Sequence, residues 1–89
     1  MPTEQPSALQ FPCEFPIKVI GNNSETFEIE VLTIIKQYVR NLRENAIRTK
    51  PSKNSKYLAI TITINAQSQQ QLDTIYQALN QCPLVQIAL

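Results

Sequence analysis

Two hydrophobic periods meet between residues 57 and 79, and this change limits the possible folds more than any other feature of the chain. In residues 57–64, YLAITITI, every second residue is leucine or isoleucine, which predicts a β-strand with one apolar face. Ser68 then precedes Gln71 by three residues, the spacing of a capping box. Apolar residues follow at a helical spacing, at Leu72, Ile75, Tyr76 and Leu79. The short connection predicts a strand that crosses directly into a helix over the same sheet face.

A second strand and helix precede this unit. Residues 15–21, FPIKVIG, alternate apolar and mixed positions and end at Gly21, the only glycine of the chain. Asn22, Asn23 and Ser24 are candidate N-caps, and Asn22 has the capping-box offset from Glu25. The segment that follows predicts a helix of about 20 residues. Its apolar stripe comprises Phe27, Val31, Ile34, Ile35, Tyr38 and Leu42.

Two shorter strands complete the expected set. Residues 47–50 alternate weakly and predict a short strand that ends near Lys50, followed by a polar hairpin loop from Pro51 to Lys56. Pro83 prevents the second helix from continuing. The closing LVQIAL then predicts a strand with its buried positions at Val85, Ile87 and Leu89.

The element order is therefore strand, helix, strand, strand, helix, strand. With so few elements, the simplest packing is an α+β, ferredoxin-like βαββαβ two-layer sandwich, a four-stranded antiparallel sheet with both helices on one face. A chain of 89 residues has material for one core only. We expect residues 1–12, which contain Pro2, Pro6 and Pro12, to form a flexible tail and residues 13–89 to form the single domain.

Composition argues against catalysis. The chain has no histidine, so the usual acid–base side chain at neutral pH is absent. Glu25, Glu28 and Glu30 suit the start of a helix, and a phosphate-cradling loop would need glycines that the chain lacks. Cys13 and Cys82 are far apart and in no metal-ligand pattern, which indicates free thiols. We predict no enzyme activity, no metal and no cofactor; an enzyme would need one of these cysteines as nucleophile without a histidine to activate it.

The N-terminus has neither a basic start nor a long apolar run, so it does not resemble a secretory signal. Apolar runs elsewhere are too short to span a bilayer. We therefore expect a cytoplasmic protein without membrane contact.

Basic side chains concentrate in one region although the formal net charge is only +1. Residues 43–56 contain five basic residues and one acidic residue, Glu44. This local excess of positive charge could bind an anionic partner such as RNA, a phosphorylated metabolite or an acidic protein patch. The simpler interpretation, which we prefer at this point, is a solvated hairpin whose lysines protect an edge strand. The five basic residues are Arg43, Arg48, Lys50, Lys53 and Lys56.

The sheet face opposite the helices is the second candidate surface. Single-stranded RNA would need stacking aromatic residues, as in RRM domains, and this face offers only Tyr57. Small and threonine side chains suit shallow contact with another protein or a second copy, or a plain solvated face. The expected residues are Lys18, Ile20, Tyr57, Ala59, Thr61, Thr63, Gln86 and Ala88.

Four segments of the chain are distinctive in combination: FPCEFPIKVIG, KPSKNSKYLAITITINA, QLDTIYQAL and LVQIAL. On these segments the chain resembles the YbeD-type family of small bacterial proteins, over about residues 11–89. The resemblance implies an ACT-like fold and, by analogy, a regulatory or ligand-sensing role. Where the family hairpin usually has glycine, this chain has Ser55, which would be mildly strained if the turn needs a positive φ. Other family motif positions are Lys18, Gly21, Lys50, Ser52 and Tyr57.

The sequence thus predicts a non-catalytic regulatory or protein-interaction module that binds a protein partner, or itself, through the sheet. The alternative is a weak RNA-binding or small-molecule-sensing domain that uses the basic hairpin and the open sheet face. The candidate interaction residues are Lys18, Arg48, Lys50, Ser52, Lys53, Lys56, Tyr57 and Thr61.

Overall fold

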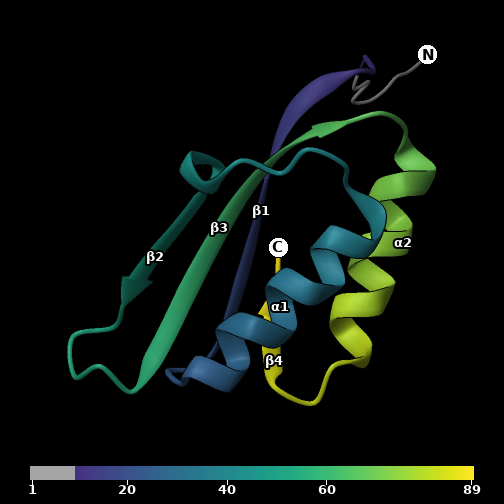
Figure 1. Ribbon diagram of the computed structural model, residues 1–89. Helices are drawn as coiled ribbons and strands as arrows, with labels where there is room; N and C mark the ends of the chain where they lie inside the picture. Colours follow the sequence, from purple (N-terminus) through teal and green to yellow (C-terminus); the bar gives the residue numbers. More distant parts are fainter. Residues whose placement is uncertain (1–9) are drawn as a thin grey trace, which may run out of the picture.

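The computed structural model describes residues 10–89 as a four-stranded antiparallel sheet with two helices on one face (Figure 1). The strands lie in the order β2-β3-β1-β4, which confirms the predicted ferredoxin-like fold. Of the expected tail, residues 1–9 lie outside the described part of the chain. In chain order the elements are β1 (Cys13–Asn22), α1 (Glu25–Tyr38), a 3-10 turn η2 (Glu44–Ala46), β2 (Ile47–Pro51), β3 (Tyr57–Ala66), α2 (Gln69–Gln81) and β4 (Val85–Ala88).

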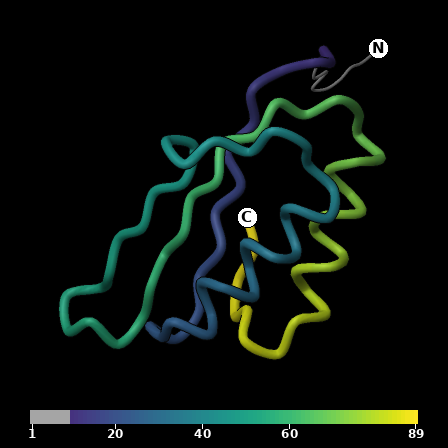
Figure 2. The backbone as a smooth tube through the Cα atoms, viewed as in Figure 1, coloured from purple at the N-terminus to yellow at the C-terminus, as the bar shows by residue number. Residues whose placement is uncertain are grey.

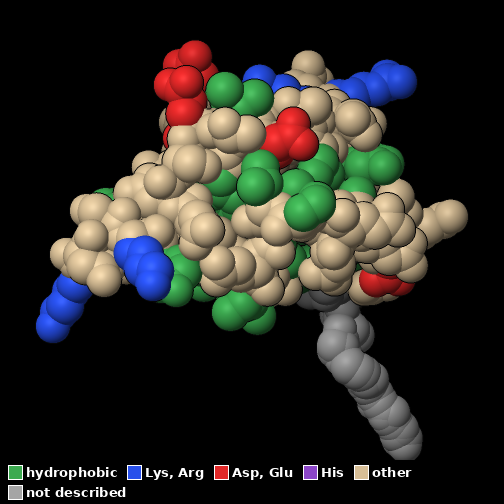
Figure 3. Space-filling view, turned by 90° about the horizontal axis from the view of Figure 1, so that it is seen from below, with side chains coloured by type: hydrophobic (Ala, Val, Ile, Leu, Met, Phe, Trp, Pro, Cys, Tyr) green, Lys and Arg blue, Asp and Glu red, His purple; other side chains and the backbone are tan. Residues whose placement is uncertain are grey.

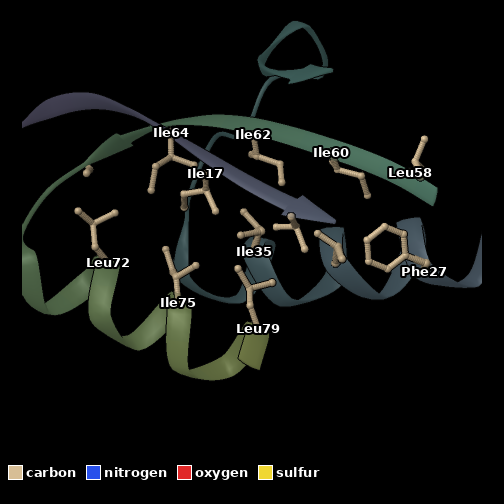
Figure 4. Close-up of a cluster of buried hydrophobic side chains, with 13 residues drawn as sticks. Ile17, Phe27, Ile35, Leu58, Ile60, Ile62, Ile64, Leu72, Ile75 and Leu79 are labelled. Atoms are coloured by element: carbon tan, nitrogen blue, oxygen red, sulfur yellow. The ribbon is translucent and has the colours of Figure 1, made fainter. Parts of the chain in front are cut away.

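The core is a single apolar layer between the sheet and the helices. Every second side chain of β3 points toward the helices, as the alternation predicts, and meets the apolar stripes of α1 and α2 (Figure 4). β3 is central because it pairs with β1 along ten residues and with β2 along five. The side chains with at most 2% exposure include Ile17, Val19, Phe27, Ile35, Ile60, Ile62, Ile64, Leu72, Ile75 and Leu79.

Helix α1 is shorter than the sequence pattern suggests. It begins after Ser24, whose hydroxyl accepts a hydrogen bond from the backbone N–H of Phe27 at 3.1 Å, so Ser24 is the N-cap. It ends at Tyr38, and Val39 is extended, with φ −128° and ψ 124°. The prediction of about 20 residues was therefore wrong. The chain must leave the helix layer to reach the edge strand β2, so Leu42 packs against the core from the connection and not from the helix.

Helix α2 begins as the capping pattern predicts. The hydroxyl of Ser68 accepts a hydrogen bond from the backbone N–H of Gln71 at 3.1 Å. The side chain of Gln71 reaches back one residue further than in the standard capping box and accepts from the N–H of Gln67 at 2.7 Å. The local sequence thus fixes where the crossover from β3 ends.

A β-bulge changes the direction of β4. Ile20 pairs with Ile87, whereas Gly21 pairs with Val85, so the register shifts within one step and Gln86 becomes the extra residue. Gly21 permits this arrangement because a Cβ there would lie 2.5 Å from the ring of Phe27 and would also meet the carbonyl oxygen of Leu84. Beyond the bulge, the side chains of β4 face opposite to the predicted alternation.

The predicted orientations of three C-terminal residues were consequently wrong. Ala88 pairs with Val19 and packs against the core, although we expected it on the open side. Ile87 and Leu89 are 47% and 63% exposed, although we expected both to be buried. Leu89 exchanges backbone hydrogen bonds with Lys18 at 2.7 and 3.0 Å, so the chain end lies along β1 (Figure 2).

Two further observations concern the ends and the exterior of the domain. β1 begins at Cys13, two residues before the alternation we used to predict it, and Phe11 packs against the core.

Within residues 10–89, neither helix has the length and apolar character needed to cross a membrane.

Replacing Gly21 with alanine tests the close packing at the bulge. A methyl group would press on the Phe27 ring and on the backbone at Leu84, so we expect the free energy of unfolding to fall by about 2–3 kcal/mol in urea denaturation. The neighbouring exposed residue gives a matched control, because Asn22→Ala should change stability by less than about 1 kcal/mol. Equal stability of Gly21→Ala and wild type would show that the bulge does not need glycine.

Candidate functional site

The sheet surface away from the helices, which we call the open face, brings most of the predicted interaction residues together. In the antiparallel register Arg48 lies beside Thr61, and Thr61 lies beside Lys18, so these three side chains form one row across β2, β3 and β1. The next row consists of Lys50, Ala59, Ile20 and Ile87. Two residues each from β2, β3 and β1 and one from β4 therefore build a continuous surface that carries three cations together with Ile20 and Ile87.

The apolar part of the open face was missed in the sequence analysis. Ile87 lies beside Ile20, and Leu89 lies beside Lys18. In the sequence, Ile87 and Leu89 occupy the positions that a regular alternation would bury. They point outward because the bulge opposite Gly21 shifts the alternation by one residue. The one available signal was the position of the only glycine, where the turn residue Leu84 and the Phe27 ring approach β1 closely.

A shallow hollow of about 230 Å³ lies on the open face near the hairpin. Ile20 and Ala59 form part of its surface, together with Lys50, Ser52 and Tyr57. Three of these, Lys50, Ser52 and Tyr57, are positions that carry the resemblance to the YbeD-type family. The hollow is open to solvent, and its lining is mostly apolar.

The hairpin between β2 and β3 explains Ser52 as a structural residue. Its hydroxyl accepts a hydrogen bond from the N–H of Tyr57 at 3.0 Å and donates one to the side-chain oxygen of Asn54 at 3.0 Å. The same oxygen of Asn54 accepts from the N–H of Lys56 at 3.1 Å. Ser52 therefore shapes the turn and is not needed as a contact residue.

Lys53 and Lys56 are exposed on this hairpin, apart from the row of Arg48 and Lys18. Figure 3 shows basic side chains projecting at the end of the molecule that carries the hairpin. The ammonium nitrogen of Lys56 lies 5.5 Å from the ring centroid of Tyr57, a cation–π contact. This contact occupies one face of the only aromatic ring that the strands present on the open face.

The described residues contain little that could support chemistry. Cys13 and Cys82 are both free, as predicted, and Cys82 is buried. Burial raises the pKa of Tyr76, but this side chain lies on α2 in the helix layer. No three histidine, cysteine or carboxylate side chains within residues 10–89 come together as a metal site.

Comparison with solved structures identifies the class of domain. The ACT domain of the GTP pyrophosphokinase of Chlorobium tepidum superposes with a TM-score of 0.68 and 14% sequence identity, covering 85% of this chain and 94% of that domain. Protein HP0495 from H. pylori gives a TM-score of 0.68 and 22% identity over 92% of this chain and 86% of its own. The chain is therefore an ACT-like α+β domain.

The family follows from the sequence comparisons. The model described as "Protein of unknown function (DUF493)" matches residues 6–89, and the chain belongs to this family. It is 40% identical to UPF0250 protein NE1487 of Nitrosomonas europaea, over 93% of this chain and 95% of that protein. A UPF0250 protein of Paraburkholderia phytofirmans is 36% identical over 93% of both chains. The resemblance to the YbeD-type family agrees with this assignment.

The hairpin gives a prediction about stability. Ser55 has a φ of 59°, so the position does require the conformation that glycine adopts most easily. We expect Ser55→Gly to raise the free energy of unfolding by about 0.5 kcal/mol, because relief of backbone strain exceeds the added chain entropy of glycine. Ser52→Gly is the control and should lower it by about 1 kcal/mol through loss of the hydrogen bond to Tyr57. Urea denaturation measures both; a less stable Ser55→Gly variant would contradict the expectation.

Proposed function

We propose that this protein is a non-catalytic regulatory module that binds an acidic protein partner on the open face. The observation that carries the proposal is an open face with cations toward one edge and exposed apolar side chains at the other. Arg48 and Lys50 lie on the edge strand β2, whereas the exposed Ile87 and Leu89 lie beside β1, where Leu89 neighbours Lys18. Exposed apolar groups next to like charges are typical of a surface that a complementary partner covers. The ACT-like fold of the chain supports a regulatory role by analogy.

The charge of the open face defines the chemistry of the partner. Glu14, near the start of β1, is the one carboxylate in the four strands, and the strand segments 16–22, 47–51, 57–63 and 85–89 contain no aspartate or glutamate. The acidic residues Glu25, Glu28 and Glu30 lie on α1, in the layer on the other side of the sheet. A partner that pairs with the open face should therefore present carboxylates to the cations and apolar side chains to Ile20, Ile87 and Leu89.

Self-association through the same face is less favourable. A symmetric contact between two open faces would bring Lys18, Arg48 and Lys50 of both copies into one interface. Like charges brought together at an interface oppose association. For this reason an acidic partner explains the surface better than a second copy.

Single-stranded RNA is also a weaker candidate. RNA recognition on a sheet depends on aromatic rings that stack with bases. The open face has Tyr57 alone, and Lys56 lies over its ring at 5.5 Å. The basic residues could still attract phosphates, so RNA binding remains a useful competing outcome of the experiment.

The proposal predicts that a bound partner depends on both parts of the open face. The tagged protein is used to capture partners from a bacterial lysate, and the affinity of the purified partner is then measured against variants. Lys50→Glu and the double variant Ile87→Ser with Leu89→Ser should each weaken binding by about tenfold or more, because they remove charge pairing and apolar contact respectively. The captured protein should be acidic, and its association rate should fall with added salt.

Two changes in the helix layer provide matched controls. Lys36→Glu reverses the same charge on α1, and Ile29→Ser removes an isoleucine that is 55% exposed. Both controls should bind the partner as well as wild type. Three outcomes would overturn the proposal. The control variants could weaken binding of the partner as much as the open-face variants do, the protein could capture RNA and no acidic protein, or it could associate only with itself.

A further inference from the structure

A second and larger hollow, of about 970 Å³, lies at the end of the domain away from the hairpin. The connection from α1 to β2 forms one side of it, the last residues of β3 form another, and the start of α2 forms a third. We call it the arginine hollow. Its size is that of a pocket for a small ligand.

The arginine hollow exists because β2 covers only part of β3. The pairs between these strands begin at Ile47 with Ile62, while β3 continues to Ala66 with β1 as its partner. Within residues 10–89, the edge from Thr63 to Asn65 on the β2 side therefore has no strand beside it. Thr63 and Asn65 of this short edge line the hollow, and the backbone oxygen of Asn65 already accepts a hydrogen bond from the side chain of Gln67 at 3.1 Å.

Hydrogen bonds fix the walls of the hollow. The side chain of Gln71 donates to the backbone oxygen of Tyr38 at 2.8 Å and accepts from the N–H of Gln67 at 2.7 Å. It therefore links the first turn of α2 to the last residue of α1. In the connection, Asn41 has a φ of 59°, which turns the chain toward β2. The site is thus preformed on two sides.

The distribution of basic residues is the second observation. All three arginines of the chain, Arg40, Arg43 and Arg48, line the hollow, and none of its five lysines does. Glu14 is the only carboxylate among the lining residues. The two cation types differ chemically, because a guanidinium binds a phosphate through two parallel hydrogen bonds whereas an ammonium acts as a point charge. If these positions served only to keep the protein soluble, lysine would serve as well as arginine.

The geometry points to a binding site for a small phosphorylated metabolite that carries at least two negative charges. Three guanidinium groups against one carboxylate leave an excess of two positive charges in the hollow, which matches such a ligand. The uncovered edge of β3, residues 63–65, is about 10 Å long, with the start of β2 at one end and the start of α2 at the other. A peptide strand or an RNA chain would need a longer track.

This site is separate from the protein-binding surface proposed above. Arg48 belongs to both, but Arg40 and Arg43 lie in the connection and not on the open face. The two proposals can consequently fail independently. Binding of the metabolite near one end of the sheet would give the module a ligand to sense.

Titration of the full chain with inorganic pyrophosphate tests the inference, followed by amide chemical shifts in NMR and by calorimetry. We expect saturable shifts at Thr63, Asn65 and Gln67. Arg40→Gln with Arg43→Gln should weaken binding by about tenfold or more, since two charge-assisted contacts are removed. Arg43→Lys keeps the charge but loses the planar fork, so it should weaken binding several-fold.

The double variant Lys53→Gln with Lys56→Gln is the matched control, because it removes the same charge from the exposed hairpin. It should bind pyrophosphate within about twofold of wild type at about 0.15 M salt. Three results would overturn the inference: no saturable binding, equal loss in the arginine and lysine variants, or tighter binding of citrate than of pyrophosphate. The last would indicate a carboxylate ligand.

Discussion

The isoleucine face of β3 holds the domain together. Ile60, Ile62 and Ile64 are at most 2% exposed and lie at the centre of the sheet, where both helices pack on them (Figure 4). Burying each such side chain contributes about 1.5–3 kcal/mol relative to leaving it in water. Because side chains alternate along a strand, fixing this face toward the helices also fixes the opposite face toward solvent. The open face is therefore a direct consequence of the core.

The bulge at Gly21 decides what that open face contains. Without it, Ile87 and Leu89 would continue the buried alternation of β4, and the surface would be basic and threonine-rich only. The close approach of Leu84 and Phe27 to Gly21 shifts the register by one residue, which turns both apolar side chains outward beside Lys18 and Ile20. The presence of glycine at this one position thus decides whether the open face is a plain solvated surface or a candidate binding surface.

Positive charge falls into two chemically different groups. Four of the five lysines, all but Lys36 on α1, lie on the open face or its hairpin, where flexible point charges suit a protein surface. Arginines border the hollow that appears where β2 stops short of the end of β3. A regulatory module needs a surface that contacts another protein and a place where a ligand acts on it. The proposed protein-binding surface and the proposed ligand site lie at neighbouring positions of the sheet, with Arg48 common to both.

The sequence by itself determined the elements of the fold. The alternation in β3, the caps at Ser24 and Ser68 and the hairpin before Tyr57 are local signals, each set by one residue and its close neighbours. The structure places Lys18, Arg48, Lys50, Tyr57 and Thr61 on the open face and Lys53 and Lys56 on the hairpin, where Ser52 shapes the turn. That these eight residues contact a partner stays a prediction. Only the tertiary structure decided the end of α1 at Tyr38, the reversed face of β4 and the arginine hollow. These features depend on the distance that a connection must span and on how closely two segments of backbone approach each other. The residues involved are far apart in the sequence, so no local sequence pattern predicts their contacts.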